Sequence, residues 1–189
     1  MKELNRRAFL KLSGAAVVAL SLAGCGGGSS APAAPSAPTG KEAELVAAIN
    51  KVWKKKFDAG LVDHEQLTLN QEAQGAIKIQ GGIFEDAKES VHTLTKEDMK
   101  KLVGIPEWQS SLEKKYDLGG AAGISEPSAE FEVSLTFEYS CEDAAVRKFV
   151  DELLNIYSDD RKAEFISIYC PVVQGKTYMI ATVFWNKTA

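Results

Sequence analysis

The sequence contains little histidine and little cysteine, which limits the chemistry it can support. Two histidines, His64 and His92, and three cysteines occur among 189 residues. No histidine follows His92, and no cysteine has a companion at CxxC spacing, so the usual zinc-ligand patterns are missing. A GxSxG nucleophile elbow, a glycine-rich phosphate loop and an HExxH motif are also absent. These absences argue against the common hydrolases, P-loop enzymes and zinc proteases.

The sequence has no excess of basic residues. It carries 22 Lys and Arg against 26 Asp and Glu, a net charge of −4. If residues 1–24 are removed as a signal, four basic residues and one acidic residue leave with them, and the net charge becomes −7. Such a chain is poorly suited to phosphate backbones or anionic lipid headgroups. We therefore expect no nucleic-acid partner.

The apolar run near the N-terminus, residues 12–22, is too short and too diluted with serine, glycine and alanine to span a bilayer permanently. It follows Arg6 and Arg7, which precede an aromatic residue, a leucine and a lysine. This arrangement resembles a twin-arginine export signal. The sequence predicts a signal peptide over residues 1–24, with the twin-arginine and the general secretory routes both open.

Residues 22–25 read Leu-Ala-Gly-Cys and resemble the lipobox of bacterial lipoproteins, in which the cysteine is acylated and becomes the first mature residue. Attachment through more than one acyl chain at Cys25 would anchor the protein stably. Residues 26–40 contain only Gly, Ser, Ala, Pro and one Thr, the composition of a flexible tether. We expect a membrane-anchored extracytoplasmic protein with one domain, 41–189; the alternative is an ordinary secretory signal with a chance cysteine.

The second half of this domain alternates strand and helix patterns. Residues 130–139 place a large apolar residue at every second position, which is typical of a half-buried strand. Ser140 is a suitable N-cap for a helix over 142–157 with one apolar stripe. The apolar runs 165–173 and 177–185, separated by a glycine-containing break, predict a β-hairpin.

The first half of the domain is predicted to be mainly helical. Residues 44–57 form an amphipathic pattern, and Asn70 can cap a second helix that we expect Gly81 and Gly82 to stop. A capping box formed by Thr95 and Asp98 should open a short helix that ends at 103. Two further segments complete the prediction: a helix over 107–116 and a loop over 119–128.

Several segments resemble the CAP superfamily of cysteine-rich secretory, antigen 5 and pathogenesis-related proteins. They are ELVAAINK at 44–51, LTLNQEA at 67–73, YSCEDAAV at 139–146, LN at 154–155, GKTY at 175–178 and VFW at 183–185. The resemblance implies an α+β fold, a three-layer α–β–α sandwich with an antiparallel sheet and a C-terminal hairpin. It also implies a cleft, and family members bind lipids, sterols, peptides or glycans.

In the family, two histidines and acidic residues in this cleft can bind a divalent metal such as zinc. His92 resembles the first histidine, whereas the second would fall near Asp160. The family's glutamate would fall near a valine, with Glu130 and Glu132 as the nearest substitutes. One histidine makes a weak zinc site, so we expect no cofactor and a His92 that binds no ligand; the alternative is a divalent metal such as zinc at His92. We expect His64 to be a solvated loop residue.

Cys141 and Cys170 form either a disulfide or two free thiols, and the sequence leaves both open. A Cys141–His92 nucleophile pair can be drawn, but nothing in the sequence sets their separation. We therefore expect a domain that binds a small ligand without catalysis. The alternatives are a hydrolase-type enzyme with a reduced metal site around His92, or a scaffold of the cell envelope.

Overall fold

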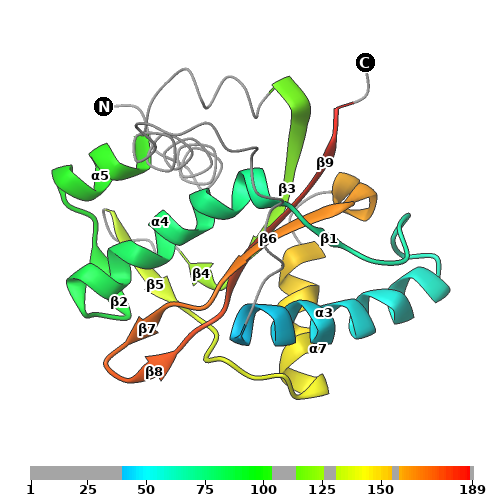
Figure 1. Cartoon of the computed structure of the whole chain (residues 1–189), viewed down its shortest axis with the longest axis horizontal. Coiled ribbons are helices and arrows are strands. Elements are labelled where there is room, and N and C mark those ends of the chain that lie inside the picture. The colour runs from blue at the N-terminus through cyan, green and yellow to red at the C-terminus, as the bar shows by residue number, and fades with distance from the viewer. Residues whose placement is uncertain (1–39, 104–113, 126–130, 155–157, 188–189) are drawn as a thin grey trace, which may run out of the picture.

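The computed structural model describes residues 40–103, 114–125, 131–154 and 158–187, which form a mixed α+β fold (Figure 1). The coarse fold class predicted from the sequence is therefore confirmed. The predicted signal peptide, Cys25 and nearly all of the predicted tether lie outside the described residues.

A four-stranded sheet forms the centre of the fold, in the order β1-β6-β9-β3. Its strands are β1 (Thr68–Leu69), β6 (Phe165–Tyr169), β9 (Ile180–Asn186) and β3 (Tyr116–Ala122). β9 pairs antiparallel with β6 and with β3, whereas β1 lies parallel to β6. The sheet is therefore not wholly antiparallel as expected. The long connection from β1 to β6 returns the chain in the same direction, as parallel pairing requires.

Helices cover both faces of this sheet. α3 (Lys41–Asp58) and α7 (Asp143–Leu154) pack on one face, and α4 (Gln71–Ala87) packs on the other (Figure 1). Successive residues of a strand point to opposite faces, so β6 and β9 supply side chains to both sides. The core under α3 and α7 includes Leu45, Ile49, Trp53, Phe149, Val150, Leu153, Ile166, Ile168, Ala181 and Val183.

A second core lies on the α4 side of the sheet. It is completed by α5 (Lys96–Val103) and by a small antiparallel sheet in the order β2-β5-β4. These strands are β2 (Val91–Thr93), β5 (Glu132–Leu135) and β4 (Ile124–Ser125). The buried side chains of this core include Ile77, Ile83, Phe84, Leu102, Val133, Leu135 and Ile180.

Two helices predicted from apolar periodicity, 44–57 and 142–157, correspond to α3 and to α7, which is described as far as Leu154. The predicted cap of the second helix is present, because Asn70 Oδ1 accepts the backbone N–H of Ala73 at 3.1 Å at the start of α4. The Ser140 hydroxyl accepts the amide of Glu142 at 3.1 Å, but α7 begins at Asp143, so Ser140 lies in the turn before the helix and is not its N-cap as predicted.

The predicted C-terminal hairpin is confirmed. β6 and β9 form its long arms, and β7 (Val172–Val173) pairs with β8 (Lys176–Thr177) at its tip. The two turn residues, Gln174 and Gly175, have φ angles of 51° and 78°. Positive φ at both positions is the mark of a type I′ turn, whose twist matches that of the strands it joins.

The expectation that Gly81 and Gly82 stop the second helix is wrong, since α4 continues to Ala87. A Cβ atom on Gly81 would collide with the Tyr169 ring of β6 and lie 3.2 Å from Pro171 Cβ. The glycine therefore allows the helix to approach the sheet closely. It does not end the helix.

The loop predicted over 119–128 is wrong where the structure describes it, because β3 and β4 occupy most of 116–125. A Cβ atom on Gly120 would collide with the carbonyl oxygen of Leu153 in α7. The strand contains small residues because the backbone of α7 presses against it, so it lacks the β-branched pattern that marks a strand in sequence.

The strand predicted over 130–139 is divided into two parts. β5 belongs to the small sheet, and beyond it Glu138 forms a bridge with Tyr178 of the hairpin. Leu135 lies in the core under α4, whereas Phe137 packs against the core under α3. The chain passes from one core to the other at this point. The single alternating pattern over 130–139 therefore contributes apolar side chains to two different cores.

Candidate functional site

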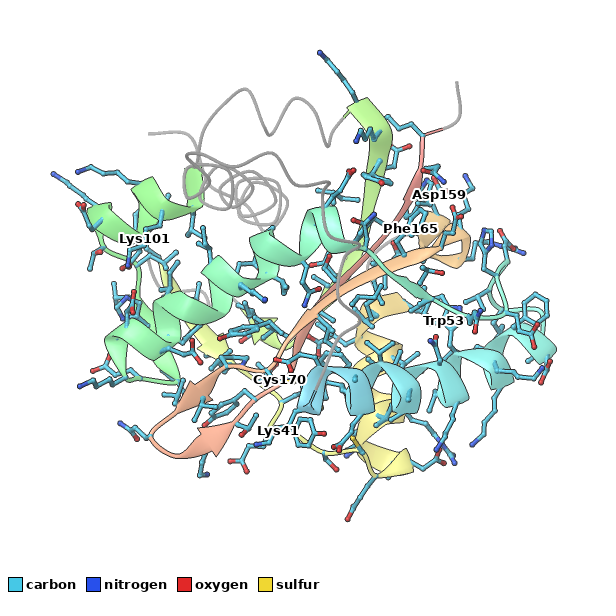
Figure 2. The ribbon with its side chains drawn as sticks, in the orientation of Figure 1. Lys41, Trp53, Lys101, Asp159, Phe165 and Cys170 are labelled. Carbon is cyan, nitrogen blue, oxygen red and sulfur yellow. The ribbon has the colours of Figure 1, made fainter. Side chains whose placement is uncertain are left out.

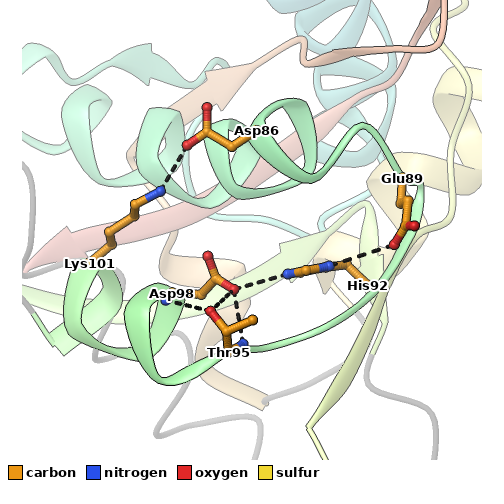
Figure 3. Close-up of polar contacts among 6 residues, drawn as sticks. All are labelled: Asp86, Glu89, His92, Thr95, Asp98 and Lys101. Carbon is orange, nitrogen blue, oxygen red and sulfur yellow. Dashed lines mark hydrogen bonds and ion pairs between the residues drawn. The ribbon is translucent and has the colours of Figure 1, made fainter.

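His92 lies in β2 opposite Val133, and its side chain is 14% exposed. Its Nε2 is 2.9 Å from Oδ2 of Asp98, and its Nδ1 is 3.8 Å from Oε2 of Glu89 (Figure 3). A carboxylate only accepts hydrogen bonds, so Nε2 carries the hydrogen. His64 is exposed, as expected for a loop residue.

Asp98 forms the predicted capping box with Thr95 at the start of α5. Its Oδ2 accepts hydrogen bonds from the Thr95 backbone N–H (2.9 Å) and hydroxyl (2.6 Å), and the Asp98 amide donates to the Thr95 hydroxyl (3.1 Å; Figure 3). Burial acts to raise the pKa of Asp98, but the hydrogen bonds from Thr95 and His92 outweigh it and hold the pKa below its usual value. The Thr95 hydroxyl donates to Asp98 and not to His92, so this cluster is a structural clamp and not a nucleophile–base pair.

Asp160, the residue expected near the second metal position, lies in the 3₁₀ helix η1 (Ser158–Lys162) and is 1% exposed. η1 packs against β3, β9 and α7. Figure 2 shows its neighbour Asp159 far from Lys101, which lies beside the His92 cluster in Figure 3. The structure therefore does not bring Asp160 to His92.

Glu132 pairs in register with Thr93, and the adjacent Val133 is the partner of His92. Because neighbouring residues of a strand point to opposite faces, Glu132 and His92 lie on different faces of the small sheet. Glu130 lies outside the described residues. Within the parts that are described, no group of three or more His, Cys, Asp and Glu side chains is placed to hold a metal ion. The donor set around His92 therefore does not fit zinc.

Cys141 and Cys170 are free thiols in this structure. Cys170 is buried in the core under α3, and burial raises the pKa of its thiol to about 12. Cys141 is exposed, and its thiol donates to the Tyr139 hydroxyl at 3.3 Å. That hydroxyl donates to Oε2 of Glu44 at 2.9 Å. Burial, followed by the contacts with Cys141 and Glu44, raises the pKa of Tyr139 above its usual value.

A hollow that brings together charged, thiol and apolar groups lies beside Cys141. It is a groove of about 490 Å³ between α3 and the start of α7. α3 contributes one stripe at i, i+3, i+4 and i+7, formed by Glu44, Ala47, Ala48 and Lys51. The opposite wall consists of Cys141, Asp143 and Val146. We call this set of residues the α3–α7 groove.

The groove forms because α3 and α7 are fixed in place near Ala47 and Ala48, whose side chains are small. Leu45 and Ile49 anchor α3 on the sheet, and a salt bridge between Lys55 and Asp143 (3.2 Å) joins α3 to the start of α7. The methyl side chains of the stripe are too short to fill the space above it. The small size of these alanine side chains leaves the groove open.

The charged groups of the groove differ in their pairing. The guanidinium of Arg147, and then the Lys55 ammonium, hold the pKa of Asp143 below its usual value. Glu44 accepts the Tyr139 hydroxyl. Among the described residues, Lys51 has no hydrogen-bond or ion-pair partner. The groove therefore carries an acid near the start of α3 and an uncompensated cation two turns later.

This groove was not predicted from the sequence, in which Glu44 and Lys51 belong to an amphipathic helix and Cys141 was considered only as a thiol. The available signal was a pair of alanines beside the apolar stripe of α3, flanked by opposite charges at i and i+7. The partner wall comes from a segment remote in sequence, so only the tertiary structure completes the site.

Comparison with protein-family models, with curated proteins and with solved structures found no match for this chain. Among the helices of the described residues, none has the length and apolar character needed to cross a membrane.

Proposed function

We propose that the protein is an extracytoplasmic lipoprotein of a bacterial membrane, anchored through acyl chains on Cys25. Arg6, Arg7 and the lipobox-like residues 22–25 support this proposal. The described domain begins with α3 at Lys41, directly after the segment with tether composition. A coil of fifteen such residues has a root-mean-square span of about 20–25 Å, which would hold the domain clear of the headgroups.

Within the α+β class, we propose that the fold is a CAP-like α–β–α sandwich. α3 and α7 on one face of the sheet and α4 on the other support it, as does the C-terminal hairpin. The chain differs from the expected pattern in the parallel strand β1 and in the separation of His92 from Asp160.

For the domain we propose ligand binding without catalysis, and the α3–α7 groove is the observation that carries this proposal. Its volume of about 490 Å³ falls within the range of about 300–1,000 Å³ that is usual for small-molecule sites. Cys141 faces it without an imidazole base beside it, because His92 is held by Asp98 in another part of the fold. This arrangement favours binding over the hydrolase alternative.

The anchor is tested by a Cys25→Ala variant of the full-length chain. We expect the domain to leave the membrane fraction, and a variant that remains fully membrane-bound would exclude a lipoprotein. Replacing Arg6 and Arg7 together by lysine should block export by the twin-arginine route. Normal export of that variant would assign the general secretory pathway.

Binding is tested through Cys141, because an occupant of the groove must shield its thiol. The rate of Cys141 alkylation by iodoacetamide in the detergent-purified full-length chain would be followed by mass spectrometry, with pools of lipids, peptides and glycans added in turn. We expect one pool to slow the reaction. If none does so, the domain is better described as an envelope scaffold.

A further inference from the structure

We infer that the occupant of the α3–α7 groove is a short zwitterionic peptide in extended form, an inference that rests on the proposed binding function. The amino terminus of the peptide would lie at Glu44 and its carboxylate at Lys51. The spacing of these two charges, their pairing and the small residues between them support this occupant.

The spacing of the two charges matches a tripeptide. Glu44 and Lys51 are seven residues apart on one face of α3, which corresponds to a rise of about 10 Å along the helix. An extended chain of three residues also spans about 10 Å. A single amino acid would reach only one of the two charges.

The pairing of the charges sets the direction of the peptide. Lys51 has no partner among the described residues, so its ammonium group is available to a carboxylate. Asp143 shares the groove but is neutralised by Arg147 and Lys55, which limits its repulsion of that carboxylate. Glu44 uses Oε2 to accept the Tyr139 hydroxyl, and its other oxygen can accept from an amino terminus.

The floor of the groove suits a peptide backbone. Ala47 and Ala48 lie between the two charges on α3 and present only methyl groups, and Val146 adds an apolar side chain from the opposite wall. Such a floor admits an extended main chain and favours small side chains next to it. Cys141 lies on the opposite wall, so a bound peptide would cover its thiol.

The test uses trialanine as the probe and the detergent-purified full-length chain as the protein. Because the charges are exposed, we expect a dissociation constant of about a millimolar, measured by calorimetry and by slower alkylation of Cys141. N-acetyl-trialanine amide, which has the same three residues without charged ends, should not bind. Lys51→Gln and Glu44→Gln should each weaken trialanine binding by about threefold to fivefold.

Lys54→Gln is the matched control, because Lys54 lies on the same helix outside the groove and pairs with Asp58 and Glu65. It should leave binding unchanged. Equal binding of the capped peptide, or equal affinity of Lys51→Gln and wild type, would overturn the peptide assignment. If trialanine fails but a lipid or glycan shields Cys141, the groove remains a binding site and only this inference falls. If no compound shields Cys141, both proposals fall.

Discussion

Nε2 of His92 lies 2.9 Å from Oδ2 of Asp98, and the same carboxylate oxygen accepts two hydrogen bonds from Thr95. One oxygen atom thus joins β2 to the first turn of α5. His92 contributes Nε2 to this clamp, while its Nδ1 lies 3.8 Å from Oε2 of Glu89.

Removal of the carboxylate should therefore destabilise the fold. We expect Asp98→Ala to lower the free energy of unfolding by about 1–3 kcal/mol, because three donors lose a largely buried acceptor. Urea denaturation of the full-length chain measures this loss. Glu97→Ala is the control, since Glu97 is exposed and forms a surface ion pair with Lys100. Equal effects of the two substitutions would contradict the clamp.

The same carboxyl should make stability depend on pH. The folded state holds the pKa of Asp98 below its ordinary value of 3.8, so the folded state binds fewer protons than the unfolded state. Its contribution is complete above about pH 4 and is lost as the pH falls through the lower, folded-state pKa. We expect Asp98→Asn to flatten the decline of stability below pH 4 relative to wild type. Parallel acid unfolding curves for the two proteins would show that Asp98 is not involved.

The two adjacent glycines of α4 should respond in opposite ways to alanine. Nothing lies within 4 Å of a Cβ on Gly82, so Gly82→Ala should stabilise the helix by about 0.5–1 kcal/mol. Gly81→Ala should destabilise by about 1–3 kcal/mol because the Tyr169 ring must move. The melting temperatures of both variants, measured by thermal unfolding, test these opposite effects. Stabilisation by both substitutions would mean that α4 does not approach β6 as closely as described.

The two cysteines of the domain should differ in reactivity. Cys141 is exposed, whereas Cys170 is buried with its pKa raised to about 12, so little thiolate is present at neutral pH. We expect iodoacetamide to label Cys141 in the folded protein and Cys170 only after unfolding. If neither residue is labelled until a reductant is added, the two form a disulfide in the exported protein.

Elements whose burial follows a simple period were predictable. α3 and α7 each bury one regular face. The hairpin was marked by two apolar runs on either side of a break that contains Gly175, a residue suited to the positive φ found there. The capping box of Thr95 and Asp98 was equally visible, because it is formed within one short segment.

Features set by close contacts between remote segments were not predictable. β3 was predicted to be a loop because it is rich in small residues. At Gly120 a small residue is needed because the carbonyl of Leu153 leaves no room for a side chain. Gly81 was predicted to end the helix because the sequence does not show that Tyr169 packs against this position. The α3–α7 groove is formed by residues on two distant helices, and the partner of His92 in the fold proved to be Asp98 and not Asp160.

The position of β9 in the sheet has a consequence for the order of folding. This strand joins β6 to β3, and it follows all other described strands in the chain. β1 likewise cannot pair until β6 has been made, since Thr68 pairs with Phe165. Long-range pairings of this kind close large loops and slow the folding reaction. Synthesis of the first half alone therefore yields no sheet, and the chain can form its native core only when its last strand has been made.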